Sequence, residues 1–539
     1  MIKIIKYKTY IFFFTISLIS FFYSVNQSLY NYDGFHSGLV LFSADGLNKN
    51  LIPYKEVFIH YGFLTTYVNS LILKLFDNNL VYIFSATSLS YSASLFILGI
   101  LIKKFSSQNF SIIGLSIIFF LHPFTIYPWH SYYTFLLFNI FLILRVSDKL
   151  YFQRISYLFL SSTILFNESF KYASFLILLF DFTIQILKEK KINFDFFKNL
   201  LAKLFLYLIP IIIFFSYIFT NELFEYWKVY SQMPKVFLEL NNVEFYEILV
   251  HFFVTLKNNI ISNLFQEPHW IIYVSLIIFN ILYLFYFFFY RFIKKSLLSD
   301  NNLALISFSS LVLLFQAAHS VTIFKMSCGL VVGFIVLFNF INSIKDKENK
   351  IIFLTTIFLL GLSCFEFVKN NSNSNYVYKY KKENFITNNY FDYFEHKKLD
   401  QNSWDHLIFT SKKIQYLKKN CKIDFAANIS SDAFISVIMR DSIQVVQKIP
   451  WFEHKKNGWM NRYFNTFLKY YDKDLSDKIN LKLEKKNIII YTDRENFPIL
   501  KIRDKKIDFS DKMNFLYLPY SYENKSKILI FPKICKNTI

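Results

Sequence analysis

The chain has 539 residues, of which 54% are hydrophobic, and its mean hydropathy is +0.32. This composition is too apolar for an ordinary soluble enzyme, and several nearly uncharged stretches reach the roughly 18 residues needed to cross a hydrocarbon core. The formal net charge of +21 comes largely from short basic clusters between apolar stretches, a pattern that indicates a multispanning membrane protein and argues against nucleic acid as a partner.

The apolar stretches predict a membrane all-α bundle of about 11 spans. The charged start MIKIIKYK precedes an apolar run without a small-x-small cleavage site, so this run is expected to stay as the first span. The spans are expected at residues 10–25, 80–102, 109–121, 131–145, 155–167, 172–187, 203–220, 269–290, 302–318, 326–343 and 351–368. Residues 57–76 include Lys74 and lie next to Glu56, so an interfacial helix in the first outer loop is expected there.

Basic residues predict the orientation of the bundle. Lys3, Lys6 and Lys8 indicate a cytoplasmic N-terminus. With 57–76 outside the membrane core, every later basic cluster between spans falls on the cytoplasmic side; counting that segment as a span would reverse all of them. We therefore expect an integral, multi-pass protein of a bacterial inner (plasma) membrane.

The composition changes near residue 370 to Asn, Lys, Asp, Tyr and Ser. We expect residues 1–369 to form the transmembrane domain and residues 370–539 to form a small α/β domain outside the cytoplasm. Within the second region, KNIIIYTD (486–493) and SKILIFPK (526–533) alternate like strands, and ISSDAFISVIMR (429–440) is typical of a helix. No internal repeat is visible.

Four cysteines form no C-x-x-C pair and no metal-ligand spacing. Cys328 and Cys364 fall in apolar spans and are expected to be inert. Cys421 and Cys535 fall in the region expected outside the cytoplasm, where a disulfide is permitted. Two free thiols are the alternative.

Residues 32–76, within the first outer loop (26–79), include ionisable groups beside the membrane, where their desolvation cost makes a functional role the first interpretation. Asp33 follows the first span by a few residues. Pro53-Tyr54 and the acidic Glu56 come next, and His60-Tyr61-Gly62 precedes the amphipathic run. Asp45 lies in ADGLNKN, a turn by composition, and is expected to be structural.

This order of residues resembles the GT-C class of integral-membrane glycosyltransferases, such as protein O-mannosyltransferases and aminoarabinose transferases. The resemblance implies a GT-C-like bundle that takes a sugar from a dolichyl- or undecaprenyl-phosphate carrier. It also implies that Asp33 is the general base and that Glu56 is a second acidic site residue. Many relatives have another acidic residue directly after the first, where this chain has Gly34. That departure leaves open whether a divalent metal is required.

Each of these residues also has a structural interpretation. Asp33 suits a Tyr-Asp-Gly turn, and Glu56 suits the start of a helix. His60 can hydrogen-bond a phosphate or a sugar hydroxyl near neutral pH, or can be an ordinary interfacial residue.

Two later segments match the class more loosely. Lys171, in LFNESFKYASF, is expected to meet the carrier phosphate as a point charge, or else to pair with Glu168 at i, i+3. His319 and Lys325 flank an expected outer turn and are candidate substrate-binding residues. Lys325 opposes the positive-inside trend, so it needs an anionic partner such as phosphate; snorkelling to the interface is the alternative.

The predicted function is therefore an inverting transfer of sugar from a polyprenyl-phosphate carrier in the membrane lipid to a glycan, lipid or protein acceptor. The chemistry needs a base for the acceptor hydroxyl and a cation for the leaving phosphate. No Gly-rich phosphate loop and no zinc motif is present in the sequence. The alternatives are a multispanning transporter or flippase, and an O-antigen polymerase or ligase acting on lipid-linked glycans.

Overall fold

The computed structural model describes residues 2–30, 34, 36–57, 59, 62–122, 128–188, 194–231, 254, 257–258, 261, 267–290, 300–314, 323–370, 385–421, 423, 425–430, 432–442, 444–445, 488–494, 499–502, 505–508, 511, 513–519 and 526–538.

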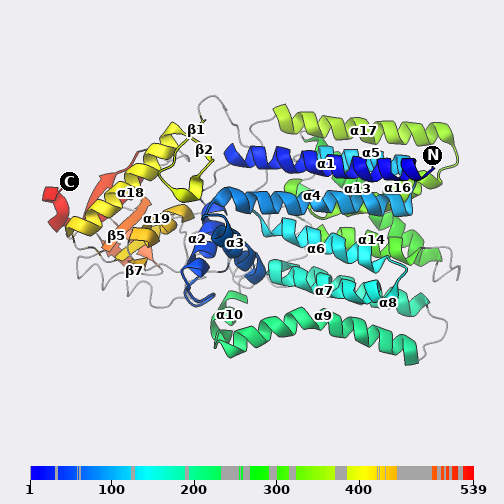
Figure 1. Ribbon diagram of the computed structural model, residues 1–539, viewed down its shortest axis with the longest axis horizontal. Helices are drawn as coiled ribbons and strands as arrows, with labels where there is room; N and C mark the ends of the chain where they lie inside the picture. Colours follow the sequence, from blue (N-terminus) through cyan, green and yellow to red (C-terminus); the bar gives the residue numbers. More distant parts are fainter. Residues whose placement is uncertain are drawn as a thin grey trace.

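Long helices run side by side through most of the molecule (Figure 1). Each expected span overlaps a described helix or two consecutive described helices. These are α1 (Ile2–Tyr30), α4 (Leu80–Phe105), α5 (Gln108–Leu121), α6 (His130–Arg145), α7 (Leu150–Phe166), α8 (Lys171–Lys188), α9 (Phe194–Thr220), α13 (Pro268–Phe288), α14 (Asn301–Val312), η4 with α16 (Leu330–Gly333 and Phe334–Ser343) and α17 (Lys347–Asn370).

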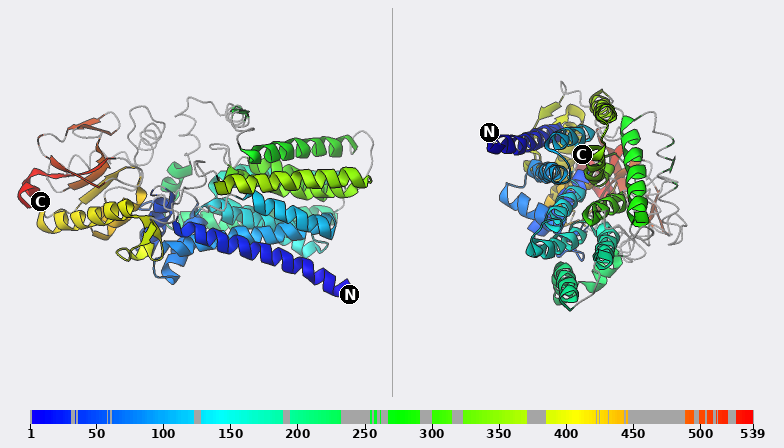
Figure 2. Two further views of the ribbon diagram at one scale, coloured as in Figure 1. Left: turned by 90° about the horizontal axis from the view of Figure 1, so that it is seen from above. Right: turned by 90° about the vertical axis from the view of Figure 1, so that its right-hand side faces the viewer.

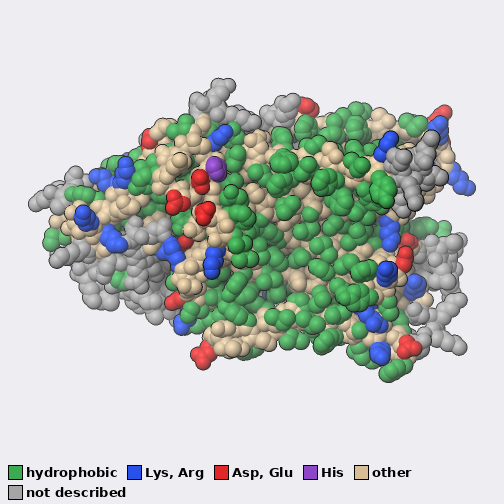
Figure 3. Space-filling view, in the orientation of Figure 1, with side chains coloured by type: hydrophobic (Ala, Val, Ile, Leu, Met, Phe, Trp, Pro, Cys, Tyr) green, Lys and Arg blue, Asp and Glu red, His purple; other side chains and the backbone are tan. Residues whose placement is uncertain are grey.

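Six of the described helices are long and apolar enough to cross a membrane, namely α1, α4, α8 with the short η1 (Glu168–Phe170) before it, α9, α13 and α17. Helices α3 (Phe63–Leu75), α5, α14 and η4 with α16 are apolar but shorter. Figure 3 shows hydrophobic side chains covering the middle of the bundle, with charged side chains gathered toward its two ends. The chain is an integral membrane protein, and the count of 11 spans stays a prediction.

The two ends of the bundle differ (Figures 1 and 2). The N-terminus of α1 lies at one end, which we call the far end. The C-terminal domain lies at the other, the domain-side end, where α2 (His36–Asn48), α3 (Phe63–Leu75) and α10 (Phe224–Ser231) are found. The interfacial helix expected over 57–76 is α3 and begins only after Gly62. The turn expected around Asp45 is wrong, because α2 continues through it to Asn48.

The described residues from 385 onward form the expected α/β structure. A five-stranded sheet has the order β4-β3-β5-β9-β8, with β3 parallel to β4 and β5, and β9 antiparallel to β5 and β8. The elements are β1 (Phe385–Thr387), β2 (Lys398–Asp400), α18 (Gln401–Cys421), β3 (Phe425–Ile429), α19 (Ala433–Ser442), β4 (Gln444–Val445), β5 (Ile488–Asp493), β6 (Ile499–Ile502), β7 (Lys505–Asp508), β8 (Met513–Tyr517) and β9 (Lys527–Pro532). The two strands and the helix named from the sequence are thus confirmed as β5, β9 and α19. The boundary at 369/370, at the end of α17, stays a prediction.

The C-terminal domain packs against the bundle through α19 and α2. A Cβ added at Gly38 would lie 2.4 Å from the Phe434 backbone nitrogen, so only glycine permits this close helix contact. A disulfide joins Cys421, the last residue of α18, to Cys535, with 5.7 Å between the Cα atoms. Cys328 and Cys364 are buried free thiols.

Candidate active site

The structure describes three of the six site residues expected from the sequence, namely Glu56, Lys171 and Lys325. Asp33, His60 and His319 lie outside the described residues. All three described residues are in segments at the domain-side end of the bundle, and the contacts of their neighbours show how these segments meet.

Lys325 is buried against an aromatic ring. It lies in the short helix α15 (Ile323–Ser327) and is 5% exposed. Its Nζ is 5.3 Å from the centroid of the Trp129 ring, and that ring lies 4.8 Å, centroid to centroid, from the ring of His36. His36 begins α2, three residues after Asp33. The buried Lys325 and the residues that follow the expected base Asp33 therefore lie close together, both beside the Trp129 ring.

The environment of Lys325 limits its charge. Burial disfavours the ammonium form and lowers the pKa of Lys325 to about 7, although the face of the Trp129 ring favours a cation. An anion bound beside Nζ would restore the full charge. This lysine is therefore suited to binding a phosphate.

Glu56 lies in a tight loop and points outward. Its Oε2 accepts a hydrogen bond of 2.8 Å from the backbone N–H of Ile52, and the side chain is exposed. The buried Tyr54 of the same loop donates its hydroxyl proton to Glu168 Oε1 at 3.3 Å. The Pro-Tyr element therefore packs on the turn that precedes Lys171.

The glycine of the His-Tyr-Gly element is explained by a close backbone contact. Gly62 has a φ of 132°, and a Cβ on it would lie 2.5 Å from the carbonyl oxygen of Phe166, the last residue of α7. Thr65 Oγ1 donates to the same carbonyl at 2.7 Å. The first outer loop and the segment around Glu168 and Lys171 are thereby held together.

Lys171 begins α8 directly after η1. It is half-buried, and its Nζ lies 5.2 Å from the centroid of the Tyr172 ring. Glu168, one turn earlier, accepts the Tyr54 hydroxyl. The arrangement is compatible with both interpretations of Lys171, as a phosphate contact and as a charge neighbour of Glu168.

The start of α6 connects the contacts around Lys325 with those between the first outer loop and the end of α7. Trp129 contacts His36 and Lys325, and four residues later Tyr133 donates to Asn69 Oδ1 of α3 at 3.0 Å. Tyr133 also packs on Phe166, with 5.5 Å between ring centroids. Sequence reasoning missed His36 and Trp129. The visible signal is the Pro-Trp-His sequence at residues 128–130, since Pro and Trp beside a span are typical of the membrane interface.

The C-terminal domain reaches the same region. The backbone N–H of Ala433, the first residue of α19, donates to the carbonyl of Gly34 at 3.0 Å. Gly34 directly follows Asp33 in the sequence, so the C-terminal domain contacts the residue next to the expected base. Asp45, interpreted as structural, forms a 3.0 Å ion pair with Arg440 of α19.

No cluster of three or more His, Cys, Asp or Glu residues suited to a metal ion occurs within the described part of the chain. Asp33 lies outside that part, so a divalent metal at the base stays an open prediction.

No protein-family model and no curated protein sequence matches the chain. Similar solved structures include the following two. The oligosaccharyltransferase of Archaeoglobus fulgidus, solved with zinc and sulfate, is 11% identical over 89% of this chain and 68% of its own, with a TM-score of 0.49. ArnT from Cupriavidus metallidurans, bound to undecaprenyl phosphate, is 8% identical over 96% of this chain and 97% of its own, with a TM-score of 0.42. Both are GT-C glycosyltransferases, the class that residues 32–76 resemble. Because both scores lie below 0.5, the function proposed below rests on this chain's own residues.

Proposed function

We propose that the protein is a membrane glycosyltransferase that moves a sugar from a polyprenyl-phosphate carrier to an acceptor at the domain-side end of the bundle. The observation that carries this proposal is the buried Lys325, which lies against the ring of Trp129, while Trp129 in turn contacts His36, three residues after Asp33. The acceptor is a glycan, a lipid or a protein.

In this proposal Lys325 meets the leaving phosphate. A charge in a buried site interacts more strongly than one in water, because the surrounding dielectric constant is low. A cation fixed where negative charge develops stabilises the transition state without reorganisation. Lys325 lies outside the apolar helices but beside them, which suits a phosphate whose lipid tail stays in the bilayer.

Asp33 removes the proton from the acceptor hydroxyl as it attacks the anomeric carbon, which inverts the configuration there. Lys171 is a second cation for the carrier phosphate, and His60 and His319 hydrogen-bond the phosphate or the sugar. Glu56 keeps its proposed place as the second acidic residue of the site, although its carboxylate also holds the Ile52 N–H.

The proposal includes an orientation. The far end, with Lys103, Lys104 and Lys149, faces the cytoplasm of a bacterial cell, and the C-terminal domain lies outside it. A reporter fused after Ile539 that is active only in the cytoplasm would contradict this arrangement.

The central experiment separates donor binding from sugar transfer in membranes that contain the full chain. Asp33→Asn keeps the size of the side chain but cannot accept the proton, so transfer from a radiolabelled polyprenyl-phosphate sugar should fall by roughly 10²–10⁴. Binding of undecaprenyl phosphate, measured by native mass spectrometry, should not change. Full transfer by a correctly inserted Asp33→Asn variant would contradict the proposal.

Lys325→Met tests the other half of the site. Removing a charge-assisted contact to phosphate should weaken binding of undecaprenyl phosphate by about tenfold or more. Lys74→Met is the matched control, because Lys74 is an exposed lysine of α3 at the same end. A transporter or flippase would instead move the labelled carrier across the membrane without forming any glycosylated product.

A further inference from the structure

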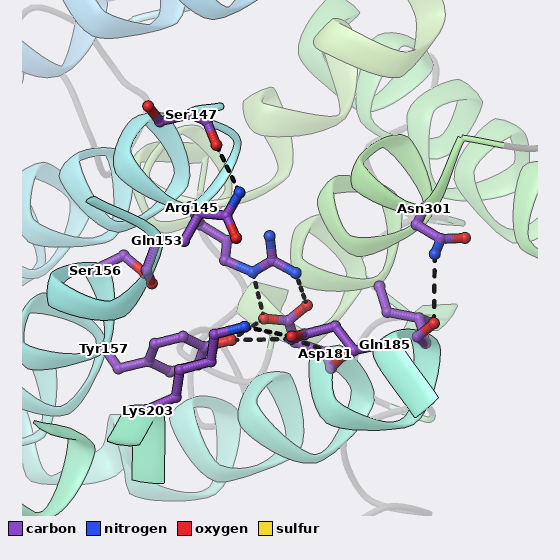
Figure 4. A network of polar contacts seen from close by, with 10 residues as sticks. Arg145, Ser147, Gln153, Ser156, Tyr157, Asp181, Gln185, Lys203 and Asn301 are labelled. Atoms are coloured by element: carbon purple, nitrogen blue, oxygen red, sulfur yellow. Dashed lines mark hydrogen bonds and ion pairs between the residues drawn. The ribbon is translucent and has the colours of Figure 1, made fainter. Parts of the chain in front are cut away.

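A second group of buried charges lies at the far end of the bundle, away from the proposed active site. Arg145, the last residue of α6, forms a bidentate contact with Asp181 of α8, with Nε and Nη2 each 2.6 Å from a carboxylate oxygen (Figure 4). The hydroxyl of Tyr157 on α7 also donates to Asp181. Asp181 is 0% exposed and Arg145 is 7% exposed.

Lys203 of α9 adds a second buried cation to this network. It is 1% exposed, and its Nζ donates to the neutral Gln185 Oε1 (Figure 4). Gln185 in turn donates to the Tyr157 hydroxyl and to the Asp181 carbonyl, each at 3.2 Å. Among the described side chains of this network, two buried cations therefore share one buried carboxylate, which leaves an excess of one positive charge.

The excess charge faces a cavity of about 560 Å³. Arg145, Lys203 and Gln185 line it together with the amides of Gln153 and Asn199. This volume falls in the range of small-molecule sites, which is roughly 300–1,000 Å³. The lining groups supply both charge and hydrogen-bond donors.

The charges at the rim of the cavity are exposed. Lys188, Asp148 and Asp300 line it but are open to solvent, so water screens them. Asp300 is also engaged, since its Oδ1 accepts from the Asn302 N–H at the start of α14 at 2.7 Å. The buried part of the cavity therefore decides the sign of the charge that it attracts.

We propose that this cavity binds a phosphate group, carried either by the headgroup of an anionic phospholipid or by a soluble phosphate. A buried cation without a full counter-charge is costly, and a phosphate oxygen beside Lys203 would supply that counter-charge with short, charge-assisted hydrogen bonds. The site is separate from the one at Lys325, because it lies at the opposite end of the helices. It would bind a second phosphate while the proposed active site at Lys325 binds the phosphate of the donor.

The test uses the full-length protein and two probes. Inorganic phosphate is titrated at constant ionic strength against protein in phosphatidylcholine nanodiscs, and the melting temperature is recorded. Retention of phosphatidylglycerol against phosphatidylcholine is measured by native mass spectrometry. Lys203→Met should lower the affinity for the bound probe by about tenfold or more. Lys198→Met is the matched control, because Lys198 is an exposed lysine of the same helix that does not line the cavity.

The pattern of results identifies the source of the phosphate. A phosphate-dependent rise in melting temperature that Lys203→Met removes indicates a soluble ligand, and a loss of bound phosphatidylglycerol indicates a lipid. If Lys203→Met does not fold, the exposed rim residue decides: Lys188→Met should fold and lower affinity by roughly twofold to fivefold. The proposal is overturned if the folded variants bind both probes as the wild type does.

Discussion

Arg440 and Lys49 offer a comparison between a buried and an exposed cation on one carboxylate. Both contact Asp45 Oδ2 at 3.0 Å. The side chain of Asp45 is 3% exposed, that of Arg440 is 11% exposed, and that of Lys49 is 37% exposed. Arg440 also donates to the Phe42 carbonyl at 2.8 Å, and its guanidinium lies 3.7 Å from the centroid of the Phe42 ring. Arg440 therefore joins α19 to α2, whereas Lys49 directly follows α2 and its contact with Asp45 does not connect the two helices.

We expect Arg440→Met to weaken the docking of the C-terminal domain by about 3 kcal/mol. Removing one partner of a buried ion pair typically costs about 3–5 kcal/mol, because the other charge stays buried. The lower value applies here, since Asp45 keeps Lys49 and the Tyr393 hydroxyl, which donates to Oδ1 at 2.9 Å. Lys49→Met removes only the exposed contact and should cost less than about 1 kcal/mol.

Hydrogen exchange of the backbone amides in α2 and α19 measures this difference, because it reports local opening. A loss of about 3 kcal/mol corresponds to exchange that is about a hundredfold faster, whereas Lys49→Met should change it by about fivefold or less. Asp45→Asn combined with Arg440→Met should cost less than the sum of the two single changes. Equal acceleration by Arg440→Met and Lys49→Met would refute the reasoning that burial sets the strength of this contact.

Three further predictions follow from other groups. Binding of the donor phosphate needs Lys325 charged, so above the pKa of about 7 the affinity should fall as pH rises; Lys325→Arg, which stays protonated, should remove that dependence. His406 is buried against the Tyr491 hydroxyl and its pKa is lowered to about 4, mainly by burial. As pH falls, the unfolded chain therefore takes up the proton before the folded chain does. The free energy of unfolding should drop by about 3 kcal/mol between about pH 6.5 and about pH 4. Circular dichroism measures this drop, and His406→Gln is the control that lacks the titrating group. Reducing the Cys421–Cys535 disulfide, which closes a separation of 114 residues, should destabilise the C-terminal domain by about 2–5 kcal/mol, and dithiothreitol should have no such effect on the Cys421→Ser variant.

Several site residues were recognisable because each signal is local. Lys171 and Lys325 attract attention as cations at the end of the bundle that the other basic clusters avoid. Glu56 belongs to a short motif that can be read directly from the sequence. The catalytic role of Asp33 stays a prediction, but its neighbours now have partners: the Gly34 carbonyl accepts a hydrogen bond from the Ala433 N–H, and the His36 ring contacts the Trp129 ring.

Other features could not be predicted because they join distant parts of the chain. His36, Trp129 and Lys325 lie in three separate segments, and no spacing rule connects them. From the sequence, Arg145 is only the basic residue that ends the span expected at 131–145. In the structure the Arg145 guanidinium binds the Asp181 carboxylate. Lys203 belongs to the same network, since its Nζ donates to Gln185.

Apolar run length predicted the helices of the bundle, and the alternation of apolar and polar residues predicted strands of the C-terminal region. Both are local properties, because a residue run is either long and apolar enough to cross a bilayer or it is not. Only the tertiary structure decided which charges are buried together, since burial depends on the helices that surround a residue. That is the reason why Lys203 and Lys198, five residues apart on one helix, face a cavity and the solvent respectively.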